Sequence, residues 1–271
     1  MRILVGTIIA NAEEAAKQWL TLQLAALRAT VDFEHVAVIP PGSRSGHIST
    51  AVEYFSKYTM ILTRLESGPL HPASLSTLQK HFLQRQKEFD GFLFLDSDAF
   101  PIRKGWLETL MGLMTGKHGS RYDIATIYRP EFGETRLHAS VLYATHPALE
   151  KLRFVSERRG ARGGDTEKDT YIDPYTDHWR RVCRLVRTNR INVHPVLAGV
   201  YGDMFYHHGC GSRNYFHKPP AWWPLADHPS FEQTIPTRLR EKLVIRPREF
   251  LSQFLWDPSL CALPDSICGS A

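Results

Sequence analysis

The sequence predicts one α/β domain built on a doubly wound sheet that is flanked by helices. Residues 3–9 and 35–39 are short, apolar, β-rich runs, and apolar residues between them recur at helical spacing. This strand–helix–strand order is typical of the start of a nucleotide-binding sheet. A further apolar run, 92–95, leads directly into two carboxylates, Asp96 and Asp98. The length of 271 residues suits a single large domain.

The remaining elements alternate between strands and helices. Asn11 can cap the first helix, whose apolar face includes Leu20 and Leu27. Pro174 suits the first turn of a later helix, and apolar residues at helical spacing run from there to Val186. The other predicted strands are 59–63, 123–128, 139–143 and 193–200, and the other predicted helices are 74–89, 106–114 and 147–152.

Asp96, Ser97 and Asp98 follow the run 92–95, and Pro101 is expected to end that strand. Open α/β sheets place their ligands at the carboxyl ends of the strands. In an extended strand residues i and i+2 point to the same side, so both carboxylates can converge on one ion. Adjacent carboxylates repel each other unless a cation lies between them, and Mg²⁺ and Mn²⁺ favour oxygen ligands. The alternative is an acidic turn, since Asp and Ser are common turn residues.

A second informative stretch is Met-Phe-Tyr-His-His-Gly-Cys-Gly-Ser-Arg at 204–213. A neutral imidazole at the end of a strand is a good metal ligand, and the glycines let the backbone approach a phosphate. Because side chains alternate along a strand, only one of His207 and His208 can point inward. Either one could therefore join the two carboxylates.

The run Phe-Leu-Phe-Leu-Asp-Ser-Asp-Ala-Phe-Pro at 92–101, followed by Gly-Trp-Leu at 105–107, resembles the Asp-x-Asp segment of nucleotide-sugar glycosyltransferases with the GT-A fold. The resemblance implies a GT-A-like mixed sheet within one continuous domain. Residues 1–101 would form its donor-binding half, and residues 102–271 its acceptor-binding and catalytic half with a C-terminal extension. It also implies that the Asp-x-Asp carboxylates hold Mn²⁺ or Mg²⁺ on the diphosphate of the sugar nucleotide.

The same resemblance assigns roles to later residues. The family places a late histidine on the metal and a glycine-rich, basic turn against the diphosphate. The spacing here favours His208 as the ligand, with His207 as the second choice, and places Arg213 and Lys218 against the diphosphate. The helix before the Asp-x-Asp segment starts near the donor in this family, so residues 71–76 are expected to line that pocket.

The remaining assignments concern the catalytic base, the donor and the acceptor. Asp173 resembles the acidic residue of the family's catalytic-base motif, and Asp169 is its rival. Thr7, Asn11 and Ser97 are further candidates for contact with the donor. The candidates for facing the acceptor are Tyr128, Arg129, Glu131 and His138.

These residues predict a metal-dependent glycosyltransferase, and a hexosyltransferase in particular. It would move a sugar from a nucleotide-diphosphate sugar to a hydroxyl of a glycan, a lipid-linked glycan, a small molecule or a modified nucleic-acid base. A nucleotidyltransferase is the nearest alternative, but residues 7–14 lack the glycine-rich, basic loop that such enzymes carry after the first strand. A nucleic-acid-binding module is another, since the net charge is +5, although basic residues are spread along the chain.

The composition is that of an ordinary globular domain, with 43% hydrophobic and 23% charged residues. No apolar run approaches the roughly 20 residues that a membrane span needs. The apolar run at the N-terminus is too short for a signal peptide. We therefore expect a cytoplasmic protein, whose mildly basic surface could contact anionic lipid headgroups.

Overall fold

The structure is a computed structural model of the chain. Its described residues form a mixed sheet of seven strands, a smaller sheet of four strands and a ribbon of two strands. Among the residues that the structure describes, no helix combines the length and the apolar character that a membrane crossing requires. The residues that the structure describes are 1–9, 20, 23–24, 26–28, 30–39, 59–62, 70–117, 119–128, 137–154, 170–172, 181–188 and 199–207.

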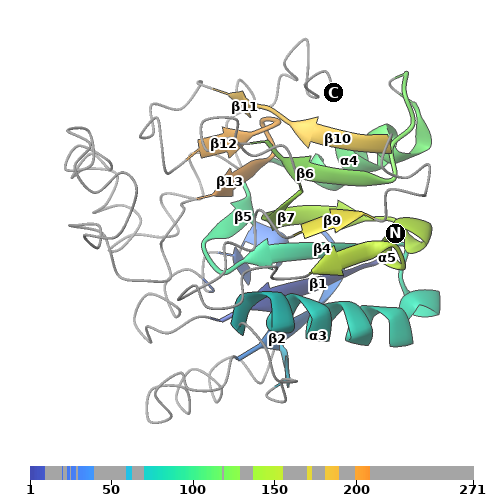
Figure 1. Ribbon diagram of the computed structural model, residues 1–271. Coiled ribbons are helices and arrows are strands. Elements are labelled where there is room, and N and C mark those ends of the chain that lie inside the picture. The colour runs from blue at the N-terminus through green and yellow to red at the C-terminus, as the bar shows by residue number, and fades with distance from the viewer. Residues whose placement is uncertain are drawn as a thin grey trace, which may run out of the picture.

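The central sheet has the strand order β10-β6-β7-β4-β1-β2-β3 (Figure 1). Every pair of neighbours is parallel except those that include β7, which runs antiparallel to both β4 and β6. The predicted α/β class, with a mixed sheet flanked by helices, is confirmed. The strands are β1 Ile3–Ile8, β2 Phe33–Val38, β3 Met60–Leu62, β4 Gly91–Asp96, β6 Ile124–Ile127, β7 His138–Ala144 and β10 Val182–Leu185.

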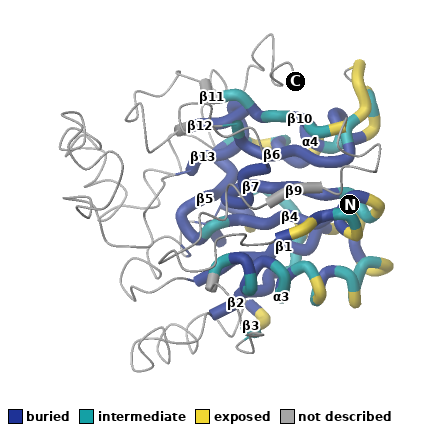
Figure 2. The backbone as a smooth tube through the Cα atoms, in the orientation of Figure 1, coloured by how far each residue is buried: buried dark blue, intermediate teal, exposed yellow. Residues whose placement is uncertain are grey.

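The continuous apolar run of β4 is explained by the burial of both faces of the sheet. Phe92 and Phe94 lie in one core cluster with Phe82 of α3 (Leu70–Gln84), which crosses the front of the sheet in Figure 1. Leu93 and Leu95 lie in a second cluster on the other face, together with residues of α4 (Trp106–Thr115). Figure 2 shows β1, β4, β6 and β7 of the central sheet buried along nearly their whole length. Alternate residues of β4 thus pack against different helices.

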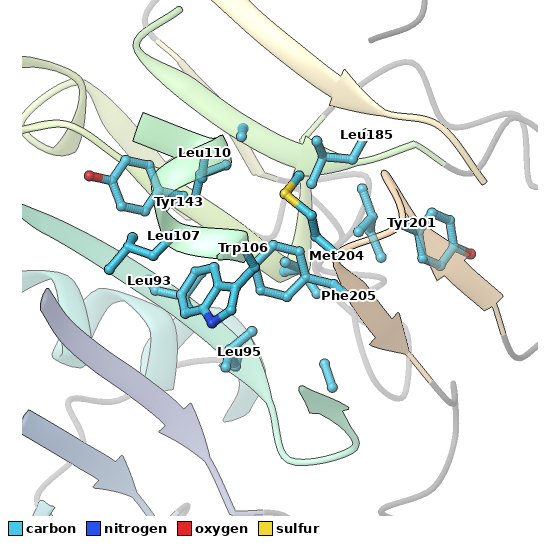
Figure 3. Close-up of a cluster of buried hydrophobic side chains, with 14 of the residues drawn as sticks. Leu93, Leu95, Trp106, Leu107, Leu110, Tyr143, Leu185, Tyr201, Met204 and Phe205 are labelled. Atoms are coloured by element: carbon cyan, nitrogen blue, oxygen red, sulfur yellow. The ribbon is translucent and has the colours of Figure 1, made fainter. Parts of the chain in front are cut away.

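The smaller sheet has the order β11-β12-β13-β5, and all its neighbouring strands are antiparallel. It is fixed to the domain through α4, because the Trp106 indole packs against the Phe205 ring at a centroid distance of 5.1 Å (Figure 3). Tyr201 and Met204 belong to the same buried cluster. This packing holds β13 beside the end of β4. The shorter elements are η1 Gln86–Glu88, β5 Ala99–Pro101, α5 His146–Leu149, β8 Leu152–Phe154, β9 Thr170–Ile172, β11 Arg187–Thr188, β12 Gly199–Tyr201 and β13 Phe205–His207.

The predicted helix from Pro174 to Val186 is wrong at its C-terminal end, where the structure has β10. Cys183 and Leu185 are fully buried while Val182 is half-buried, which is the period-two pattern of a strand. The strand pairs in parallel with β6. Apolar residues at 182, 183, 185 and 186 are compatible with both helical and strand periodicity. The segment forms a strand because it pairs with the edge of β6 that β7 leaves open.

Gly91 begins β4 at a place where the ring of Tyr143 leaves no room for a side chain. A Cβ at this position would lie 1.9 Å from the Tyr143 hydroxyl oxygen and 2.4 Å from Cζ. Tyr143 is buried and pairs with Leu93 across β7 and β4. We expect Gly91→Ala to lower the free energy of unfolding by about 1–3 kcal/mol, the usual cost of overpacking, as measured by urea denaturation.

The background Tyr143→Leu provides the control for this prediction. Alanine is otherwise favoured over glycine in a strand by about 0.5–1 kcal/mol. Gly91→Ala should therefore cost much less in the Tyr143→Leu background than in the wild-type protein, because the crowding ring is gone. An equal cost in both backgrounds would show that the ring is not the cause.

Candidate metal site

The two carboxylates lie at the carboxyl end of β4. Asp96 is the last residue of β4 and pairs with Ile8, the last residue of β1. Ser97 and Asp98 form the turn that leads into β5, and only 3% of Asp98 is exposed. The predicted strand through Asp98, ended by Pro101, is therefore wrong, because the chain turns at Ser97 and Pro101 belongs to β5. The turn, and not strand alternation, brings the two carboxylates together.

His207 completes a cluster with the two carboxylates. It is the last residue of β13 and pairs with Ala99, the residue after Asp98. Its Nε2 atom lies 3.8 Å from Asp98 Oδ1 and 4.0 Å from Asp96 Oδ2. One ligand atom from each of the three residues lies within 4.8 Å of the others. Segments far apart in the sequence therefore meet at one edge of the sheet.

The three ligand atoms are close enough for their side chains to close on a single divalent ion. Ligands about 2.1 Å from an octahedral ion are about 3.0 Å apart when adjacent and about 4.2 Å apart when opposite. Both distances from His207 Nε2 exceed the adjacent separation, so the side chains must move closer together to share one octahedral ion. Two carboxylate oxygens and one imidazole nitrogen are ligand types that divalent ions accept, and an octahedral ion would have further positions for other ligands.

Asp96 is held by hydrogen bonds to both of its carboxylate oxygens. Ser140 Oγ of β7 donates to Oδ2, and His71 Nε2, at the start of α3, lies 3.2 Å from Oδ1. Burial raises the pKa of Asp96, but the hydrogen bond and charge of His71, the charge of His207 and the Ser140 hydrogen bond together lower it to about 2. Asp96 is therefore ionised at any pH where the protein would be assayed, as a metal ligand must be.

His138, a candidate for facing the acceptor, lies beside His207. It is 1% exposed, and its ring meets the His207 ring edge to face at a centroid distance of 5.5 Å. The Ser140 N–H donates to His138 Nδ1 at 3.3 Å, so this ring nitrogen acts as an acceptor. A bulge in the β6–β7 pairing places His138 here, where it also exchanges two hydrogen bonds with the Thr126 hydroxyl.

The structure places some of the candidate residues and leaves others outside the residues that it describes. His208 was preferred over His207, but it is His207 that the structure places beside the carboxylates. Thr7, a candidate for contact with the donor, is fully buried in β1, and its hydroxyl hydrogen-bonds Gln23 and His35 inside the protein. The candidates that lie outside the described residues are Asn11, Arg129, Glu131, Asp169, Asp173, His208, Arg213 and Lys218.

The contacts of Asp96 with Ser140 and Gln23 were not predicted. Ser140 lies in the apolar run that forms β7. Because β7 is antiparallel to β4, the beginning of β7 lies beside the carboxyl end of β4, where Asp96 is. Gln23 lies on the helix that faces the core, where a polar residue interrupts an apolar stripe. A buried polar residue within an apolar stripe was the one available signal, since such a residue needs a hydrogen-bonding partner.

No protein-family model and no curated protein sequence matches the chain. Solved structures with similar folds include the mannosyltransferase PcManGT from Pyrobaculum calidifontis in complex with GDP-Man and Mn²⁺. That alignment has 15% identity and a TM-score of 0.43, and it covers 70% of this chain and 58% of that chain.

Two further similar structures come from bacteria. S. aureus TarS 1–349 in complex with UDP-GlcNAc aligns with 19% identity and a TM-score of 0.32, over 48% of this chain and 34% of that chain. Glucosyl-3-phosphoglycerate synthase from Mycobacterium tuberculosis, in complex with phosphoglyceric acid, aligns with 14% identity and a TM-score of 0.39, over 62% of each chain. The aligned region thus spans between a third and two thirds of these proteins. The roles of the residues rest on the geometry of the site itself.

Proposed function

We propose that this protein is a metal-dependent glycosyltransferase that moves a sugar from a nucleotide-diphosphate sugar to a hydroxyl acceptor. The observation that carries the proposal is the convergence of Asp96, Asp98 and His207 at the carboxyl edge of the sheet. This edge is where open α/β sheets bind nucleotides. The Asp-x-Asp resemblance of residues 92–101 supports the same assignment.

In the proposed reaction the bond between the anomeric carbon and the diphosphate oxygen breaks, and a bond to the acceptor oxygen forms. Asp96 and Asp98 would hold Mn²⁺ or Mg²⁺ with His207, while Ser140 and His71 fix the orientation of the Asp96 carboxylate. When bound, the ion would supply Lewis-acid stabilisation of the charge that grows on the departing nucleotide diphosphate.

The remaining steps fall to residues proposed from the sequence. Arg213 and Lys218 would contact the diphosphate and balance its charge. If the reaction inverts the anomeric centre, a carboxylate must take the proton of the acceptor hydroxyl, and Asp173 is the proposed base, with Asp169 as its rival.

Thermal unfolding in the presence of nucleotides tests the proposal. UDP-GlcNAc and GDP-Man, each with and without Mn²⁺, are suitable first probes, and UDP and GDP complete the set. A ligand at about 100 times its Kd adds about 2.7 kcal/mol to stability, which raises Tm by several degrees. We expect this rise with Mn²⁺ and its loss in EDTA.

The outcome separates the candidate classes. Stabilisation by nucleoside triphosphates but by no sugar nucleotide would indicate a nucleotidyltransferase and contradict the proposal. Stabilisation by no nucleotide in the presence of Mn²⁺ would also contradict it. Release of free nucleoside diphosphate from the stabilising donor then measures turnover directly.

A further inference from the structure

The side-chain amide of Gln23 lies directly beneath the turn that carries Asp98. Gln23 belongs to the helical segment before β2 and is fully buried. Its Nε2 atom donates to the backbone carbonyl of Asp96 at 2.8 Å and to that of Ala99 at 2.7 Å. One amide group thus joins both ends of the turn, and each of its two hydrogens has an acceptor.

The other end of the Gln23 amide continues into a chain of buried hydrogen bonds. Thr7 Oγ1 lies 2.7 Å from Gln23 Oε1 and 2.9 Å from His35 Nε2. His35 Nδ1 in turn lies 2.9 Å from Thr59 Oγ1. All four side chains are buried, and the chain crosses from the first helix through β1 and β2 to the start of β3.

The chemistry of the groups fixes the direction of every hydrogen bond in this chain. The carbonyls of Asp96 and Ala99 only accept, so Gln23 must present its NH₂ to the turn and its oxygen to Thr7. The Thr7 hydroxyl donates to that oxygen and therefore accepts from His35 Nε2–H, which leaves Nδ1 to accept from Thr59. Burial, with a smaller contribution from Arg28, lowers the pKa of His35 to about 3, so the ring is neutral as this arrangement requires.

Burying this chain of hydrogen-bonded side chains carries a desolvation cost that apolar side chains would avoid. The position of the hydrogen bonds indicates their role. Without Gln23, two backbone carbonyls at the end of β4 would be buried against the helix without their donor. The same turn presents two carboxylates close to each other, whose mutual repulsion pushes them apart before a cation binds. A rigid backbone at this turn is therefore needed to keep both carboxylates on one ion.

We propose that Gln23 is a positioning residue of the metal site. It holds the Asp96–Ala99 turn so that Asp98 faces His207, and Thr7, His35 and Thr59 fix its amide in the required orientation. The identity of the cation rests on the proposed function, whereas the effect of Gln23 on the turn does not.

Another glutamine of the protein, Gln79, serves as a matched control for this inference. Gln79 Nε2 of α3 also donates to two backbone carbonyls three residues apart, those of Leu149 at 2.7 Å and Leu152 at 3.0 Å. These carbonyls follow β7 and so lie at the opposite edge of the sheet from Asp96. Gln79→Leu therefore removes the same kind of bridge without touching the metal site.

We expect both Gln23→Leu and Gln79→Leu to lower stability in urea denaturation. Only Gln23→Leu should weaken Mn²⁺ binding, by about 10- to 100-fold, the usual effect of a residue that orients metal ligands. Calorimetry with Mn²⁺ alone measures this affinity. Only Gln23→Leu should also speed hydrogen exchange in the peptide that covers residues 96–101, measured without metal.

Thr7 supplies a second pair of variants in case Gln23→Leu does not fold. Thr7→Val keeps the shape of the side chain but removes the hydroxyl, so it should weaken Mn²⁺ binding in the same direction. Thr7→Ser keeps the hydroxyl and should restore affinity close to that of the wild-type protein. A merely structural role for Thr7 would give the same Mn²⁺ affinity in both variants and would overturn the inference.

The two measurements separate this inference from the proposed function. Wild-type protein that binds no Mn²⁺ would contradict the proposed function, and hydrogen exchange of residues 96–101 would still decide the role of Gln23. Unchanged exchange and unchanged Mn²⁺ affinity in Gln23→Leu would overturn the positioning role while leaving the metal site in place.

Discussion

We expect Asp98→Asn to reduce the affinity for Mn²⁺ by more than about 100-fold. Substitution of residues that only orient metal ligands already reduces metal affinity by about 10- to 100-fold, and Asp98 is a proposed ligand itself. Asn keeps the shape of the side chain but removes the negative charge of a buried ligand. The fold should survive, because the substitution preserves packing and removes a like-charge contact with Asp96. Asp96→Asn should have a similar effect on Mn²⁺, measured by calorimetry.

Asp123 is the control for this pair of variants. It is also a buried aspartate, paired with Arg181 at 3.5 Å, but it precedes β6 at the opposite edge of the sheet. Asp123→Asn should lower stability and leave Mn²⁺ affinity unchanged. Wild-type affinity in both Asp96→Asn and Asp98→Asn would exclude the site.

His207→Ala should weaken Mn²⁺ binding by about 10- to 100-fold without abolishing it, because the two carboxylates remain as ligands. His208→Ala should have a smaller effect, since His207 is the imidazole beside the carboxylates. The matched control is His146, whose ring packs on Phe92 far along β4 from Asp96. His146→Ala should leave Mn²⁺ affinity unchanged, and an equal loss in His146→Ala and His207→Ala would exclude a ligand role.

The pH dependence provides a second measure of the same ligand. An imidazole must be neutral to bind a metal, and it ordinarily gains a proton below about pH 6.5, so affinity should fall as the pH falls. The pKa of Asp96, lowered to about 2, keeps that carboxylate ionised over this range, so it does not contribute to the decrease. Titration of Mn²⁺ from about pH 7.5 to about pH 5.5 should show a flatter profile in His207→Ala than in wild type.

His71 also lies next to Asp96, so its contribution to this profile must be measured separately. His71→Gln removes the titrating group but keeps a side chain that can donate a hydrogen bond. A profile that is flattened by His71→Gln and unaffected by His207→Ala would assign the pH dependence to His71.

The sequence predicted the parts of the fold in which one physical requirement dominates. Residues 92–95 are apolar on both faces because β4 is covered on both sides, and only a central strand needs that pattern. Asp96 and Asp98 stand out because charged residues directly after such a strand must lie at a sheet edge. The class of fold and the place of the carboxylates therefore followed from local pattern alone.

The parts that the sequence did not predict depend on pairing between distant segments. Whether His207 or His208 points toward the carboxylates is decided by the register of β13 against β5. A shift of that register by one residue would turn the His207 imidazole to the other face of the strand. The role of Gln23 was hidden for a related reason, since its acceptors are backbone carbonyls more than seventy residues away.

The pairing of β13 with β5 also has a consequence for the order in which the protein gains its binding capacity. His207 and Ala99 are joined across more than a hundred intervening residues. Pairings of such long sequence separation form late, because closing the long loop costs entropy that local contacts do not. During synthesis at the ribosome, Asp96 and Asp98 would emerge after His71 but well before His207, and so the nascent chain would carry the two carboxylates without the imidazole that completes the cluster. Full affinity for the proposed cation would then be reached only at a late stage of folding, after β13 has paired with β5.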